Sequence, residues 1–282
     1  MLSLSCVRFA HHPSTEWLPI QLNPRSRTFA NKPCNPVRYQ HKLNKDLYVK
    51  RAKVVAGIPS FWPLAIEQSP PDIDEYIQPT DAILLLNHLT SLSVERFELP
   101  DGDPRSISIK WEFSENDTFE NKVLEKKFWW RRAKDEWEGL VSEPVEIKWK
   151  EGKDLTNGML TLVKTIADEE AAGKTDETPA KKQLKEKMDN TALDGLSFFA
   201  WFGFRGRKIS NEEHAEATKK YEEKRRALKA GEKTDAMEED EEEDEDDEEY
   251  EWEIFPTGDD LAVCISDDLW PNALNYFSKL PK

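Results

Sequence analysis

A run of carboxylates close to the C-terminus limits how this chain can fold. Residues 238–251 contain thirteen Asp or Glu residues and no Lys or Arg. Such a run repels itself and buries little surface, so we expect it to be disordered. Apolar residues return after it at the spacing of one helical face, at Leu269, Ala273, Tyr276, Phe277 and Leu280. The acidic run is therefore expected to be a loop inside a domain whose core closes at the C-terminus.

Strand patterns fill the middle of the chain. Ile107, Ile109, Trp111 and Phe113 alternate with polar residues, which predicts a strand with one apolar face. Residues 92–99, 122–132 and 145–149 read as three further strands, with a bulge near Glu95 or Arg96 and a turn over 100–104. Four short antiparallel strands need helices over their apolar face, so the expected fold class is α+β.

Helices are predicted both before and after the strands along the chain. Periodic apolar residues indicate helices over about 42–56 and 79–87, and charged residues indicate a solvated helix over 211–230. Asp267 and Asp268 could cap the C-terminal helix. Residues 150–195 are polar and are expected to be mobile with local helix, whereas the aromatic residues at 197–202 should dock on the core.

Composition excludes several classes of function. The net charge of -16 disfavours a direct DNA or RNA binder and favours basic partners. Cys6, Cys34 and Cys264 are far apart and lack metal-ligand spacing, so no metal site is predicted. No P-loop, dinucleotide turn or nucleophile elbow is found, and no run of about 18 apolar residues could cross a membrane. We therefore expect that the protein is not an enzyme, that it binds no cofactor and that it does not contact a membrane.

The chain divides into a leader and one domain. Residues 1–41 are basic, proline-rich and predicted to be disordered; a transit peptide and an error in the gene prediction are the alternatives. Residues 42–282 form the expected domain, with a charged insertion over 205–251 that includes the acidic loop at 238–251.

Six ordered sequence blocks resemble one known family. They are Ile58-Pro59-Ser60-Phe61-Trp62, the segment 89–95, the segment 113–124, the segment 147–156, Ser197-Phe198-Phe199-Ala200-Trp201-Phe202, and Asp267-Asp268-Leu269-Trp270-Pro271-Asn272. Together they resemble the nucleosome assembly protein (NAP) family, specifically its SET-like branch. The resemblance implies a nuclear histone chaperone, shuttling with the cytoplasm, with an earmuff-shaped α+β domain. It also implies a homodimer formed by a long N-terminal helix, histones held on an acidic underside, and no cofactor or chemical step.

Two features depart from the family pattern. Only about residues 42–56 can form the dimerisation helix, so this helix is expected to be short, which argues against a homodimer. The acidic tract, which many relatives carry as a tail, is inserted before the last helices. A scaffolding subunit that binds or inhibits a chromatin-modifying enzyme or a phosphatase is therefore the alternative function.

The candidate histone-binding residues are all carboxylates. They are Glu112, Glu115, Asp117, Glu120, Glu238, Glu239, Asp240, Glu241, Glu242, Glu243, Asp244, Glu245, Asp246, Asp247, Glu248, Glu249, Asp259 and Asp260. Ordinary solvated surface is the alternative interpretation of the first four, and a solvated spacer is the alternative for the acidic run. Core histones are the expected partner, and a histone-modifying enzyme is a second candidate.

Overall fold

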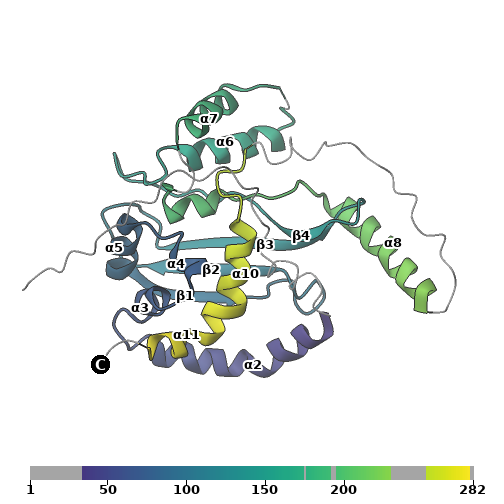
Figure 1. Cartoon of the computed structure of the whole chain (residues 1–282), viewed down its shortest axis with the longest axis horizontal. Helices are drawn as coiled ribbons and strands as arrows, with labels where there is room; N and C mark the ends of the chain where they lie inside the picture. The colour runs from purple at the N-terminus through teal and green to yellow at the C-terminus, as the bar shows by residue number, and fades with distance from the viewer. Residues whose placement is uncertain (1–33, 175, 192–194, 230–251, 280–282) are drawn as a thin grey trace, which may run out of the picture.

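The computed structural model describes residues 34–174, 176–191, 195–229 and 252–279 (Figure 1). The predicted disorder of residues 1–33 and of the acidic loop at 238–251 therefore lies outside the described residues, as does Leu280. A four-stranded antiparallel sheet in the order β1-β2-β3-β4 forms the centre. Its strands are β1 (Leu89–Glu95), β2 (Ile107–Phe113), β3 (Val123–Arg132) and β4 (Glu138–Ser142).

Three of the four predicted strands are confirmed. Trp111 of β2 pairs with Leu92 of β1 and with Leu124 of β3, so all three side chains lie on the buried face. The predicted bulge near Glu95 or Arg96 is wrong, because the register shifts between Leu89 and Ser91 and the strand ends at Glu95.

The prediction that residues 145–149 form a fourth strand is wrong. This segment bonds to two separate partners: the amide of Val145 donates to the carbonyl of Phe202, and Trp149 forms an isolated bridge with Phe119. The true fourth strand, β4, has only Leu140 buried, so its sequence lacks a strong alternating pattern.

Helices surround the sheet. They are α2 (Cys34–Val55), α3 (Phe61–Glu67), α4 (Pro71–Asp74), α5 (Pro79–His88), α6 (Met159–Ala171), α7 (Pro179–Asp189), the 3-10 helix η2 (Phe198–Gly203), α8 (Asn211–Lys229), α10 (Gly258–Cys264), the π-helix η3 (Ile265–Leu269) and α11 (Trp270–Phe277). Figure 1 shows α2 along one side of the sheet, α6 and α7 on the opposite side, and α8 projecting beyond β4.

The N-terminal helix is longer than predicted. Helix α2 has 22 residues and begins at Cys34, so the predicted start near Lys42 and the predicted disorder of residues 34–41 are wrong. Pro36 lies in its first turn, where the missing N–H would have no helical partner in any case. Arg38 donates to the carbonyl of Gly102 at 2.5 Å, which holds this first part of α2 against the β1–β2 connection.

Two further helix predictions are corrected by packing. Residues 150–195 are not simply mobile, because Met159, Val163 and Ile166 of α6 are fully buried. Asp267 and Asp268 do not cap a helix, because the C-terminal helix already begins at Gly258. Asp267 instead pairs with Arg96 at 3.1 Å, and Asp268 accepts hydrogen bonds from Asn272 and Tyr276.

Helix α8 forms as predicted but is not wholly solvated. Ala217 is buried, and the guanidinium of Arg132 stacks on the ring of Tyr221, 3.5 Å from its centre. These contacts, together with a hydrogen bond from the amide of Arg132 to His214 Nδ1, attach α8 to the end of β3.

The aromatic segment in η2 docks on the core, as predicted, and it is fully buried there. Phe199 is fully buried among the rings of Phe113, Phe119, Trp149 and Phe202. The neighbouring Trp201 donates through Nε1 to the carbonyl of Gly258 at 2.8 Å, so the same segment also fixes the start of α10.

Two buried charges tie the segment to its neighbours. Asp81 of α5 accepts hydrogen bonds from Ser197 Oγ and the amide of Phe198, both at 2.7 Å, and burial raises the pKa of its carboxyl. Lys126 of β3 donates to the carbonyls of Phe202 and Phe204, and burial lowers the pKa of its ammonium group to about 7.

Phe199→Ala should lower the free energy of unfolding by about 3–5 kcal/mol, because it leaves a cavity among several rings. Leu228→Ala is the matched control, since Leu228 is 58% exposed and its truncation should change stability by less than about 0.5 kcal/mol. Urea denaturation followed by circular dichroism measures both, and equal effects of the two substitutions would contradict this account of the core.

Candidate binding surface

Four predicted carboxylates gather where β2 ends. Glu112 is half-buried at the end of the strand, and Glu115, Asp117 and Glu120 are exposed on the loop that follows. Only one base, Lys122, lies in the same stretch of 112–122. We call Glu112, Glu115, Asp117 and Glu120 the carboxylate loop.

The backbone of the carboxylate loop is held in place by hydrogen bonds. The buried Asn116 accepts through Oδ1 from the amides of Thr118 and Phe119, both at 2.9 Å. Phe119 is 1% exposed and anchors the loop in the aromatic core. The charged side chains therefore extend from a fixed backbone, which reduces the conformational entropy lost when a partner binds.

A second segment runs beside this loop. The amide of Glu120 donates to the carbonyl of Lys148, and the amide of Lys150 donates to the carbonyl of Thr118, both at 2.9 Å. This pairing brings the segment 146–151 alongside the predicted carboxylates, and the segment carries the exposed Glu146 and Glu151 together with Lys148 and Lys150. Sequence reasoning missed both glutamates, although Glu146 falls on the polar side of the apolar pattern at Val145 and Ile147.

The open face of the sheet carries charges of both signs. Lys110 of β2 lies 3.7 Å from Glu125 of β3, and Ser108 donates to the same carboxylate at 2.7 Å. Lys127 lies on the same face, next to Glu125 in the alternating pattern of β3. An excess of acid is thus found at the end of the sheet, in the carboxylate loop, rather than across its open face.

Asp259 and Asp260 belong to a different part of the molecule. They occupy the first turn of α10, next to α4, and both are half-buried. Burial, followed by the neighbouring charge of Asp260, raises the pKa of Asp259 to about 7. Burial also raises the pKa of Asp260. The structure therefore does not bring these two predicted residues together with the carboxylate loop.

The predicted acidic residues 238–249 lie outside the described residues, but the base of the insertion that contains them is described. The buried Glu253 accepts hydrogen bonds from the amides of Arg205 and Gly206 at 2.9 and 3.2 Å. Its pKa is raised by burial. The chain thus leaves the core after Phe204 and returns to it at Glu253. The hydrogen bonds from Arg205 and Gly206 to Glu253 join the two ends of the insertion.

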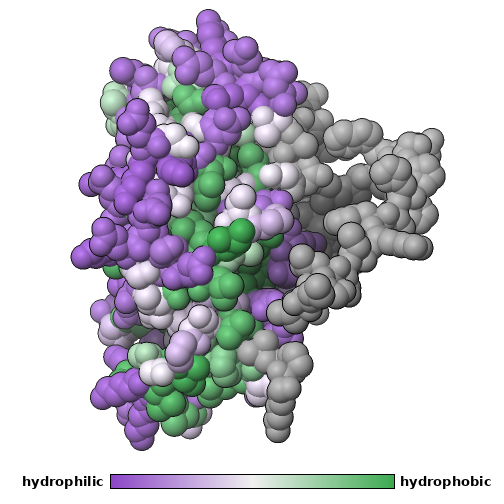
Figure 2. Space-filling model, turned by 90° about the vertical axis from the view of Figure 1, so that its left-hand side faces the viewer, coloured by the Kyte–Doolittle hydropathy of each residue, from purple (hydrophilic) through white to green (hydrophobic). Residues whose placement is uncertain are grey.

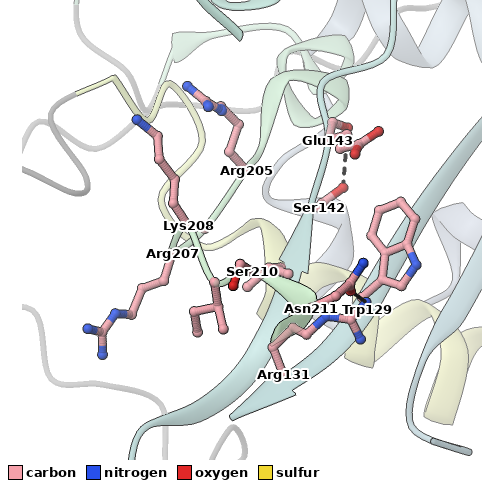
Figure 3. A pocket seen from close by; sticks show the side chains of 12 residues that line it. Trp129, Arg131, Ser142, Glu143, Arg205, Arg207, Lys208, Ser210 and Asn211 are labelled. Atoms are coloured by element: carbon pink, nitrogen blue, oxygen red, sulfur yellow. Dashed lines mark hydrogen bonds between the residues drawn. The ribbon is translucent and has the colours of Figure 1, made fainter. Parts of the chain in front are cut away.

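A pocket of about 340 Å³ lies where the insertion leaves the core and is lined by four basic residues. Each of these four side chains already contacts an acidic or amide side chain of the protein. Arg205 and Lys208 both contact Glu170, at 2.6 and 3.0 Å, and Arg207 contacts Asp135 at 2.6 Å. Arg131 donates to Asn211 Oδ1 at 3.1 Å. Figure 3 shows the side chains of Arg205, Arg207 and Lys208 directed away from Trp129, so we assign no anion site to this pocket.

No metal site or membrane span is found in the described part of the chain. Its His, Cys, Asp and Glu side chains form no group of three or more that could hold a metal ion. Its helices include none that is both long and apolar enough to cross a bilayer.

Asp259→Asn should stabilise the protein at pH 8 and have little effect near pH 4. The folded state keeps a proton on Asp259 between its ordinary pKa of 3.8 and about 7, so wild-type stability falls as the pH rises through this window. The asparagine variant lacks this loss. Melting temperatures of both proteins from pH 4 to pH 8, with the exposed Asp117→Asn as control, measure the difference, and parallel profiles would contradict it.

Comparison with known proteins agrees with the sequence blocks. Residues 27–280 match the nucleosome assembly protein family. The chain is 29% identical over 242 residues to Protein SET of Drosophila melanogaster, covering 84% of this chain and 61% of that protein. It is 28% identical to NAP1-related protein 2 of Arabidopsis thaliana over 238 residues, covering 84% and 64%. The chain thus spans less than two thirds of the length of these relatives.

Solved structures share the fold. A crystal structure of Vps75 has a TM-score of 0.53 and 21% identity, covering 87% of this chain and 89% of that chain. A crystal structure of Ccp1 has a TM-score of 0.53 and 22% identity, covering 91% of each chain. The predicted α+β fold is therefore confirmed, and the match over residues 27–280 shows that the chain belongs to the nucleosome assembly protein family.

Proposed function

We propose that this protein is a histone chaperone that binds core histones through the carboxylate loop and the acidic tract at 238–251. The observation that carries the proposal is the set of exposed carboxylates held on a fixed backbone in a member of the nucleosome assembly protein family. One solved neighbour, Vps75, is itself described as a histone chaperone. The proposed role is binding, and it needs no catalytic residue or cofactor.

Electrostatics explains how such a surface could hold histones. Each exposed ion pair contributes only roughly 0–1 kcal/mol, so affinity must come from many pairs acting together. The field of each charge is screened beyond about 8 Å at physiological salt, so the carboxylates must lie close to the histone. The net charge of -16 would also repel DNA, the competitor from which histones must be taken. We accordingly place the protein in the nucleus.

Helix α2 supports dimerisation within this proposal. Tyr39, Leu43, Leu47 and Val54 share one face of the helix and are 57–67% exposed. An apolar stripe along a helix of about 33 Å is suited to pairing with the same stripe of a second copy. The greater length of α2 thus removes the main argument against a homodimer.

Neutralising the carboxylate loop should weaken histone binding. Glu115→Gln, Asp117→Asn and Glu120→Gln together remove three charges, and we expect roughly tenfold lower affinity at ~0.15 M salt, with a smaller effect at higher salt. Fluorescence titration of purified core histones and of duplex DNA against the full chain, across a salt series, provides the measurement. Deletion of residues 238–251 tests the acidic tract in the same assay.

The control for that experiment neutralises three exposed carboxylates outside the surface, Glu186, Glu212 and Glu223. Equal losses in both triple variants would show that net charge alone determines binding, and would reject the carboxylate loop. A folded wild-type protein that does not bind histones at physiological salt would reject the chaperone function and favour the scaffolding alternative.

Leu43→Asp combined with Leu47→Asp should convert the protein from a dimer to a monomer, because two charges would interrupt the apolar stripe of α2. Light scattering coupled to size-exclusion chromatography measures the mass, with Leu228→Asp on α8 as an equally exposed control. A monomeric wild-type protein, or a variant that keeps the wild-type mass, would overturn this role of α2.

A further inference from the structure

Helices α3 and α5 enclose an exposed apolar groove of about 230 Å³. The buried Ile66 and Leu85 line its floor, and Ile83 and Leu86 of α5 stand at its side, 62% and 48% exposed. Figure 2 views the side of the molecule where these helices lie and shows apolar side chains gathered in a band down the middle of that face. Exposed apolar patches of this kind commonly mark sites of protein contact.

The charges around the groove select for a basic partner. Glu67 and Asp74 lie at its rim, both exposed, and neither forms an ion pair within the part of the chain that the structure describes. The sequence from residue 54 to residue 95 contains six Asp or Glu residues and no Lys or Arg, so no base of this stretch is available to neutralise them. An acidic partner segment would be a poor electrostatic match for this rim.

We propose that the α3–α5 groove is a docking site for a basic amphipathic helix of a partner protein. Apolar side chains spaced one turn apart on that helix would enter the groove and pack against Ile83 and Leu86. Lysines or arginines beside them would face Glu67 and Asp74. Such pairing of an amphipathic helix with an apolar groove is a recurrent mode of recognition. The groove shares no residue with the carboxylate loop, although His88 at the end of α5 accepts a hydrogen bond from the amide of Ser114 between Glu112 and Glu115. The proposal does not depend on the chaperone function.

A synthetic fluorescent peptide tests the proposal with the full chain. The peptide has about 16 residues, with leucines at helical spacings i, i+3, i+4 and i+7 and with lysines and arginines at most other positions. Ile83→Ser combined with Leu86→Ser should weaken its binding at least tenfold or so, because anchor residues carry most of the binding energy. Leu228→Ser, an equally exposed leucine on α8, should leave binding unchanged.

Charge and sequence order provide independent readouts. Glu67→Gln with Asp74→Asn should weaken binding several-fold at low salt and little at high salt. A peptide of the same composition with its leucines scattered around the helix should bind no more tightly to the wild type than to the Ile83→Ser, Leu86→Ser variant. Anisotropy titrations measure each affinity, and circular dichroism checks that every variant is folded.

Three outcomes would overturn the proposal. The first is unchanged affinity of the leucine-face peptide for the Ile83→Ser, Leu86→Ser variant. The second is equal binding of a peptide in which glutamates replace the bases. The third is a change of oligomeric mass caused by the groove substitutions, which would show that a second copy of the chain covers the groove.

Discussion

Burial of the aromatic segment at 198–204 against the sheet is the interaction on which the rest of the structure depends. The rings of Trp111 and Phe128 on the sheet pack against Trp201 at 6.3 and 5.4 Å. The same segment receives hydrogen bonds from Lys126 and gives one to Asp81. One short stretch of chain therefore holds together β2, β3, α5 and, through Trp201, the start of α10.

This arrangement allows a strongly acidic chain to keep a compact core. Within the described residues the buried carboxylates are Asp81 and Glu253, and each accepts three hydrogen bonds. Burial without such partners would cost several kcal/mol. The carboxylates of the loop at 112–120 remain outside, on a backbone anchored by Phe119. Charge and core are thereby separated, although they lie within a few residues of each other.

The surfaces available for partners differ in physical character. The carboxylate loop offers exposed charge, the stripe on α2 offers an extended apolar line, and the α3–α5 groove combines a small apolar hollow with acidic residues at its rim. Charged surfaces govern association rates and salt dependence, whereas apolar anchors govern how long a complex lasts. The molecule therefore offers a separate physical basis for attracting a basic protein, for pairing with itself and for retaining a helical segment.

The sequence alone determined the elements whose residues follow a strong local pattern. The strand at 107–113, the helix begun by Pro79, the docking of Phe198 to Phe202 and the family membership were all predicted, because alternation, helix starts and aromatic density are local properties. It also placed Glu115, Asp117 and Glu120 just after the strand at 107–113, because they follow it directly in the chain.

Only the tertiary structure decided the features that depend on distant contacts. The amide of Val145 donates to the carbonyl of Phe202 instead of to a neighbouring strand, so residues 145–149 do not form the predicted fourth strand. Arg38 donates to the carbonyl of Gly102, and this contact holds the part of α2 that begins earlier than predicted. The pairing of Lys148 with Glu120 and the partial burial of Asp259 likewise arise from segments that are remote in sequence. Hydrogen bonds and packing between remote segments leave no periodic signal along the chain, so they became visible only in the fold.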